Sequence, residues 1–131
     1  MSLRVGADIT AVEDVLSSMR RFGDRYVRRV FTSHEIACCR GPRLVAAASL
    51  AARFAAKEAT IKVLRPDDHA VPWRSIEVRR HPAGFCELRL SDGAAALAEA
   101  AGITELHVSL SHEAGMAAAV VVASCASEAA A

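Results

Sequence analysis

The stretch that decides the fold is RFAAKEATIKVL, residues 53–64. It consists almost wholly of helix-forming residues, and apolar residues at helical spacing precede it back to Leu44. Gly41-Pro42 breaks the chain before this segment, and Pro66 follows its end. We therefore predict one long helix over residues 44–64.

Glu58 and Lys62 lie one turn apart on the side of this helix that apolar periodicity assigns to the core. Arg53 and Lys57 fall on one flank of the apolar sector. One interpretation of Glu58 and Lys62 is a surface ion pair, which would contribute roughly 0.2–0.5 kcal/mol. The other is functional, because an inward-facing carboxylate needs a strong partner such as a divalent cation. The spacing alone leaves both open.

Asp8 has a similar character near the N-terminus. In LRVGADI, residues 3–9, apolar residues alternate with Arg4, Gly6 and Asp8, which predicts a short strand with Asp8 on its non-apolar face. Gly6 would let another group approach the backbone closely. A capping box at Thr10–Glu13 is expected to begin the next helix. Asp8 by itself is more typical of a cap, but two carboxylates from separate elements can hold Mg²⁺ together with substrate phosphate.

The whole pattern predicts one α+β domain over residues 1–123, a small sheet with the long helix packed on it, followed by a flexible tail at residues 124–131. A chain of 131 residues has room for one hydrophobic core and no second domain. The other expected elements are a short helix after a capping box at 32–35, strands near 73–80 and 85–90, an alanine-rich helix from 91 that stops at 102, and a hairpin of strands at 105–112 and 116–123.

Charge and composition narrow the class of protein. The net charge of +1 argues against binding nucleic acid or a membrane through total charge. We see neither a membrane-spanning run nor a secretory signal, so we expect a cytoplasmic protein whose four cysteines are reduced thiols. Positive charge is concentrated at residues 20–29, which hold Arg20, Arg21, Arg25, Arg28 and Arg29 against one acid, Asp24.

The strand at 105–112 has one polar face, formed by His107, Ser109 and Ser111. An imidazole and two hydroxyls in a row can donate hydrogen bonds to phosphate or ribose oxygens. The alternative, which the alternation by itself favours, is a half-exposed strand whose polar side faces water.

Three segments taken together resemble the holo-acyl-carrier-protein synthase family, the small 4′-phosphopantetheinyl transferases. They are Gly6-Ala7-Asp8-Ile9, RFAAKEA at 53–59 with Lys62, and HVSLSH at 107–112, and their order and spacing match over roughly residues 3–123. The resemblance implies an enzyme that transfers 4′-phosphopantetheine from coenzyme A to a serine of an apo acyl carrier protein, in fatty-acid or polyketide synthesis. Adenosine 3′,5′-bisphosphate is released. It also implies a homotrimer with active sites at the subunit interfaces.

The resemblance further implies a role for each candidate residue. Asp8 and Glu58 would bind Mg²⁺, or Mn²⁺ in its place, and Lys62 would neutralise the coenzyme A phosphates; these three are the expected catalytic residues, with Glu58 as the base. The expected coenzyme A ligands are Arg53, Lys57, Lys62, His107 and Ser109. The expected carrier-protein contacts are Arg20, Arg21, Arg25 and Arg28.

Two positions depart from the family's pattern. The family often has an arginine where this chain has Asp14, and commonly a glycine where it has Arg65. The first position tends to face the carrier, so we hypothesise a specialised carrier such as a polyketide synthase domain. The rival interpretations are a non-catalytic trimeric domain of the same fold that binds nucleotide or carrier, and a small scaffold in which Glu58 and Lys62 form an ordinary ion pair. Dependence on a divalent metal separates the enzyme from the scaffold.

Overall fold

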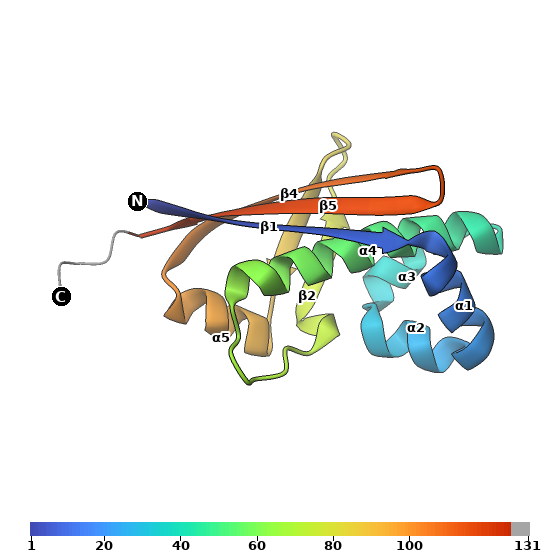
Figure 1. Ribbon diagram of the computed structural model, residues 1–131, viewed down its shortest axis with the longest axis horizontal. Coiled ribbons are helices and arrows are strands. Elements are labelled where there is room, and N and C mark those ends of the chain that lie inside the picture. Colours follow the sequence, from blue (N-terminus) through green and yellow to red (C-terminus); the bar gives the residue numbers. More distant parts are fainter. Residues whose placement is uncertain (127–131) are drawn as a thin grey trace.

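A three-stranded antiparallel sheet lies along one side of a 22-residue helix, α4 (Arg43–Leu64), in the computed structural model, which describes residues 1–126 (Figure 1). The strands are β1 (Ser2–Ala11), β5 (Met116–Cys125) and β4 (Ile103–Glu113), paired in the order β1-β5-β4. The tight turn at Ala114-Gly115 joins β4 to β5, and both turn residues have the positive φ angles that such a two-residue hairpin requires.

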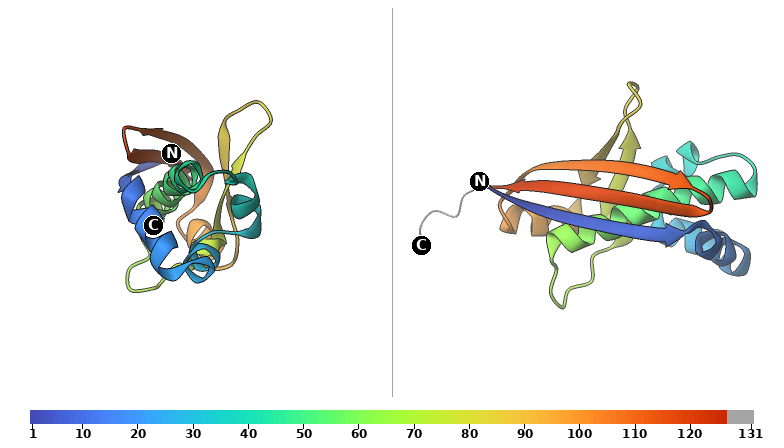
Figure 2. Two further views of the ribbon diagram at one scale, coloured as in Figure 1. Left: turned by 90° about the vertical axis from the view of Figure 1, so that its right-hand side faces the viewer. Right: turned by 45° about the horizontal axis from the view of Figure 1, so that its top comes forward.

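The other elements are arranged around α4. β2 (Ile76–Arg80) and β3 (Cys86–Leu90) form a separate antiparallel hairpin that stands across the direction of the larger sheet (Figure 2). Three helices gather at the N-terminal end of α4: α1 (Val12–Phe22), α2 (Asp24–Val30) and α3 (Ser33–Cys38) (Figure 1). The 3₁₀ turn η1 (Trp73–Ser75) and the helix α5 (Asp92–Ala100) complete the fold.

Strand β1 packs directly on the backbone of α4. A Cβ atom placed on Gly6 would lie 2.1 Å from the carbonyl oxygen of Ala59, so only glycine fits at this crossing. The neighbouring residues on the same face also contact the helix: Arg4 Nη1 donates to the Val63 carbonyl at 2.9 Å, and Asp8 pairs with Lys62. The predicted close approach at Gly6 is confirmed, and it fixes the position of β1 along the helix.

The opposite face of β1 is apolar and points away from the helix. Leu3, Val5 and Ile9 are 63%, 65% and 68% exposed, and Met116 and Val120 of β5 extend the same surface at 42% and 43%. Alternation alone predicts two faces and does not say which one meets the core. Here the glycine-bearing face meets α4, because only that face permits the close crossing, and the apolar residues are left outside.

Most predicted elements are confirmed, and two expectations are wrong. The capping box at 32–35 is present, with Thr32 and Glu35 each accepting the other's backbone N–H. No such box begins α1, because β1 continues to Ala11 and the Thr10 hydroxyl donates to Asp8 instead. The tail does not begin at 124, because Ser124 and Cys125 pair within the sheet, and residues 127–131 lie outside the described part of the chain.

All four cysteines are free thiols, as expected. Cys39 is buried, and burial raises the pKa of its thiol to about 11, so it stays protonated at neutral pH. Within residues 1–126, no helix combines the length and the apolar character needed to cross a bilayer.

The crossing at Gly6 generates a stability prediction. Gly6→Ala should lower the free energy of unfolding by roughly 1–3 kcal/mol or more, because the added methyl group forces β1 away from Ala59. The matched control is Gly93→Ala in α5, where the new Cβ would meet Pro72 at an ordinary 3.4 Å and stability should hold or rise. Urea unfolding measures both, and equal stability of Gly6→Ala and the wild type would contradict the account.

Candidate active site

A cavity of about 410 Å³ lies where β1 runs into α1 beside the middle of α4. Asp8 and Thr10 line it from β1, Asp14 and Ser18 from α1, and Glu58 from α4. Tyr26 and Phe54 provide part of its apolar wall. The two carboxylates that the sequence singled out, 50 positions apart in the chain, therefore face one cavity.

Asp8 is held by two neighbours. Its Oδ2 accepts a hydrogen bond from the Thr10 hydroxyl at 3.0 Å, and its Oδ1 lies 3.4 Å from Lys62 Nζ. The Lys62 ammonium also donates to the Ala7 carbonyl at 2.7 Å, while its side chain is 53% exposed. Lys62 thus ties α4 to β1 and keeps a positive charge beside Asp8.

Glu58 is half-buried, and its environment disfavours the ionised form. Burial is the main cause that raises the pKa of Glu58; the negative charge of Asp8 adds to it, and the positive charge of Lys62 opposes it. A cation placed between the two carboxylates would remove their mutual repulsion. The alternative of a simple Glu58–Lys62 pair is not what the structure shows, because Lys62 pairs with Asp8.

These side chains fit a hard metal ion that needs few protein ligands, such as Mg²⁺. Three acids, Asp8, Asp14 and Glu58, line the cavity together with the Thr10 hydroxyl, but within the described residues no three His, Cys, Asp or Glu side chains come together as one metal cluster. Mg²⁺ typically takes one or two protein carboxylates and completes its shell with water and substrate phosphates. Asp8 and Glu58 are the residues that would hold it.

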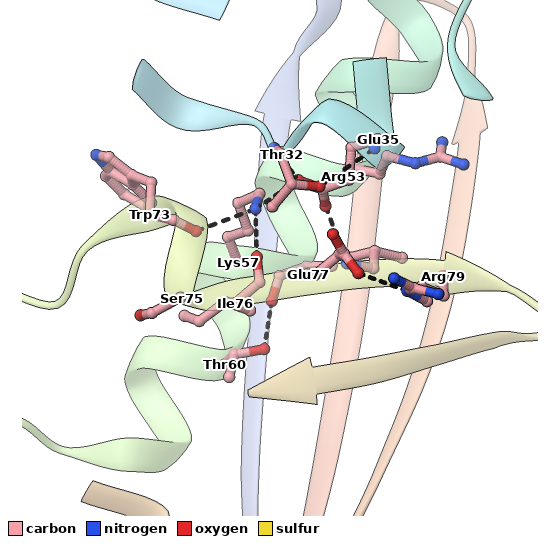
Figure 3. Close-up of polar contacts among 12 residues, drawn as sticks. Thr32, Glu35, Arg53, Lys57, Thr60, Trp73, Ser75, Ile76, Glu77 and Arg79 are labelled. Carbon is pink, nitrogen blue, oxygen red and sulfur yellow. Dashed lines mark hydrogen bonds and ion pairs between the residues drawn. The ribbon is translucent and has the colours of Figure 1, made fainter. Parts of the chain in front are cut away.

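Lys57, next to Glu58 in the sequence, points into the core (Figure 3). Its side chain is fully buried, and its ammonium lies 2.8 Å from Glu35 Oε1 and donates to the carbonyls of Trp73 and Ile76. Glu35 is fully buried too, and its carboxylate accepts the backbone N–H groups of Thr32 and Val78 at 2.9 Å each. Burial lowers the pKa of Lys57, and the Glu35 carboxylate opposes that effect.

The predicted orientation of the Lys57 side chain on α4 is therefore wrong. The sequence placed it on a flank of the apolar sector, whereas α4 is covered on that side by α3, η1 and β2. All three donors of its ammonium are used inside the protein. Direct contact with coenzyme A is not open to Lys57 in this arrangement, and its role is to join three elements to α4.

The remaining expected coenzyme A ligands lie on other surfaces of the chain. Arg53 is 9% exposed, lines a smaller cavity of about 230 Å³ with Arg80, Ser111 and His112, and keeps its buried Nε without a partner among the described residues. His107 lines a cavity beside β3, and its Nε2 lies 3.0 Å from Glu105. Ser109 is exposed on the outer face of the sheet. One chain does not bring these residues to Asp8 and Glu58.

Arg20, Arg21, Arg25 and Arg28 are all exposed on α1 and α2. Arg20 lies 4.0 Å from Glu13, and the Arg21 guanidinium lies over the ring of Phe22. Arg28 lines a separate cavity between α2, α3 and η1, together with Arg40 and Arg74.

Sequence reasoning missed that Asp14 lines the main cavity and that Glu35 pairs with Lys57. The capping box indicated Glu35 as a residue of local structure, and no signal indicated its distant partner.

Comparison with known proteins decides the family. Residues 4–121 match the family described as the 4′-phosphopantetheinyl transferase superfamily. The chain belongs to this superfamily. It is 43% identical over 123 residues to the holo-[acyl-carrier-protein] synthase of Nitratidesulfovibrio vulgaris strain DP4, covering 93% of this chain and 98% of that one. The synthase of Desulforudis audaxviator is 39% identical, with 94% and 93% covered.

Solved structures agree with the family. The Chronobacterium ammoniagenes holo-acyl-carrier-protein synthase, described as a complex with coenzyme A, superposes with a TM-score of 0.82 at 27% identity, covering 96% of this chain and 99% of that one. The Helicobacter pylori synthase, also in complex with coenzyme A, gives 0.78 at 28% identity, with 92% and 100% covered. The predicted resemblance, the α+β fold and the class of enzyme, a phosphopantetheinyl transferase, are confirmed.

The buried ion pair yields a prediction that separates structure from ligand binding. Lys57→Met should cost about 3–5 kcal/mol of stability, because it leaves Glu35 charged and unpaired in the core. The double variant Glu35→Gln/Lys57→Met should recover part of that loss, as measured by urea unfolding. The folded double variant should bind coenzyme A as the wild type does in calorimetry. An affinity about tenfold weaker would show that Lys57 takes part in coenzyme A binding after all.

Proposed function

We propose that this chain is a Mg²⁺-dependent holo-acyl-carrier-protein synthase. It transfers 4′-phosphopantetheine from coenzyme A to a serine hydroxyl of an apo acyl carrier protein and releases adenosine 3′,5′-bisphosphate. The observation that carries the proposal is that Asp8 and Glu58 line one cavity and that Lys62 lies 3.4 Å from Asp8, in a chain of this superfamily. The coenzyme A complexes of two similar structures support the choice of donor substrate.

The chemistry follows from the charges at the cavity. The serine oxygen forms a bond to the β-phosphorus of coenzyme A, and the bond from that phosphorus to the bridging oxygen of the nucleotide breaks. Lys62 places a positive charge where negative charge grows on the leaving phosphate. When bound by Asp8 and Glu58, Mg²⁺ supplies further electrostatic stabilisation of the pyrophosphate oxygens. Glu58 is the candidate to accept the serine proton, because its carboxylate comes from α4 and lines the cavity that the serine would enter.

We also propose that the working form is a homotrimer with its sites between subunits. Two observations support assembly. The outer face of the sheet exposes Leu3, Val5, Ile9, Met116 and Val120, an apolar surface of the kind that marks interfaces. His107 and Ser109 pair with Val122 and Val120 on that same face, so a second copy covering the apolar surface would lie beside them. Assembly would bring together ligands that one chain keeps apart.

The reaction class is tested by mass spectrometry of an apo acyl carrier protein incubated with coenzyme A, Mg²⁺ and this protein. The carrier should gain roughly 340 Da, the mass of the phosphopantetheine group. Asp8→Asn and Glu58→Gln should each slow the transfer by at least about 10²-fold, because each removes a charge that acts on the transferring group. Chelator should stop the reaction and Mg²⁺ should restore it. Coenzyme A binding without any mass gain would favour the non-catalytic binding domain.

Assembly is tested by charging the apolar face. Val5→Lys should convert a trimer into monomers in analytical ultracentrifugation and weaken coenzyme A binding, because a buried unpaired charge is costly at an interface. Phe22→Lys is the matched control, since Phe22 is 53% exposed on α1 and away from the sheet face. A wild-type protein that sediments as a monomer, or a Val5→Lys variant that remains trimeric, would refute this arrangement.

A further inference from the structure

We propose that Asp14 selects the acceptor and favours a carrier protein that presents a positively charged side chain next to its modified serine. Asp14 is on this view a specificity-determining residue that contacts the carrier and takes no part in the transfer itself. The inference rests on the proposed function and adds to it the charge of the acceptor that the site fits best.

The first argument is position. Asp14 and Ser18 lie one turn apart on α1 and line the same cavity as Asp8 and Glu58. The rotation of α1 is fixed by Val15 and Leu16, which are buried at 2% and 4% exposure. Because α1 forms one wall of the cavity, a serine that reaches Glu58 brings its neighbouring residues against Asp14.

The second argument is charge. Glu13 lies near Arg20, and Asp8 lies near Lys62, so both acids have a cationic neighbour. Asp14 has no ion pair or hydrogen bond to its side chain within residues 1–126, and it is exposed. An acid at the cavity wall that no internal cation compensates is available to a cation of a partner and repels an anion.

The third argument is the distribution of charge along α1. The helix begins with Glu13 and Asp14 and ends with Arg20 and Arg21, and Arg25 follows on α2. The acidic end is the one at the cavity. The segment that fits this surface therefore has a cation near its serine and acids farther from it, and the two ends of α1 together fix its direction.

An acid in the first turn also stabilises a helix through the helix dipole. That explanation and the proposal give different results. If Asp14 serves only the helix, replacing it changes stability and leaves the preference among carriers unchanged. If Asp14 meets the carrier, the preference itself changes.

The test compares two acceptors that differ in one charge. One is an apo acyl carrier protein with an acidic residue beside its serine, and the other is the same protein with that residue replaced by lysine. The wild-type enzyme should modify the lysine-bearing carrier about threefold to tenfold more efficiently in kcat/KM at low salt. Asp14→Asn should remove most of that preference, and Asp14→Arg should reverse it. The preference should shrink as salt is added.

Glu13→Arg is the matched control, because it makes the same charge change one residue away in the same helical turn but outside the cavity lining. It should keep the wild-type preference. An equal shift in Glu13→Arg and Asp14→Arg would overturn the proposal in favour of a general field effect, and so would an unchanged preference in folded Asp14→Arg. If the wild type modifies neither carrier, the proposed function fails and this inference fails with it.

Discussion

The close crossing of β1 over α4 at Gly6 and Ala59 is the constraint on which the rest of the site depends. With no side chain between them, the strand and the helix backbone are in direct contact, and the residues that flank the crossing are forced into register. Asp8 follows Gly6 on the same face of β1, Glu58 precedes Ala59 on α4, and Lys62 comes one turn later. Two acids that are 50 positions apart in sequence are thereby placed at one cavity, with Lys62 beside Asp8.

A second interaction fixes which way α4 is turned. Lys57 and Glu58 are adjacent, so their side chains point about 100° apart around the helix. The buried pair of Lys57 with Glu35 holds one of them in the core, and Glu58 is consequently directed to the cavity. A buried ion pair is weak evidence for added stability. It does fix the rotation of α4 about its axis, because turning the helix would separate Lys57 from Glu35 and leave both charges unpaired in the core.

The sequence predicts the elements of this fold better than it predicts their surroundings. The long helix, the hairpin of β4 and β5 and the capping box of α3 follow from local patterns that tertiary contacts do not alter. Thr10 was assigned to a cap because the T-x-x-E pattern is local, whereas pairing with β5 extends the strand through that position. Lys57 was misplaced because apolar periodicity treats lysine as a surface residue and cannot register a partner on α3, 22 positions away.

At the site, too, the sequence indicates residues through local patterns and does not indicate their tertiary surroundings. Glu58 stood out because it is an acid in the apolar sector of a helix, and Asp8 because it is an acid on the non-apolar face of a strand, just before a helix. Gly6 indicated a close approach but not which group approaches. Asp14 carried no such signal, since an acid in a first helical turn is ordinary. The apolar outer face of β1 was visible as alternation, but only the structure shows that no part of residues 1–126 covers it.

The central claim is that the crossing at Gly6 places Asp8 and Glu58 around one divalent ion. Paramagnetic Mn²⁺, added in small amounts to protein carrying ¹³C-labelled carboxyl groups, tests it most directly by NMR. The account predicts that the carboxyl signals of Asp8 and Glu58 broaden together at the lowest Mn²⁺ concentrations, that Mg²⁺ in excess restores them, and that Glu99 on α5 stays sharp. Broadening of only one of the two acids, or of neither, would contradict it.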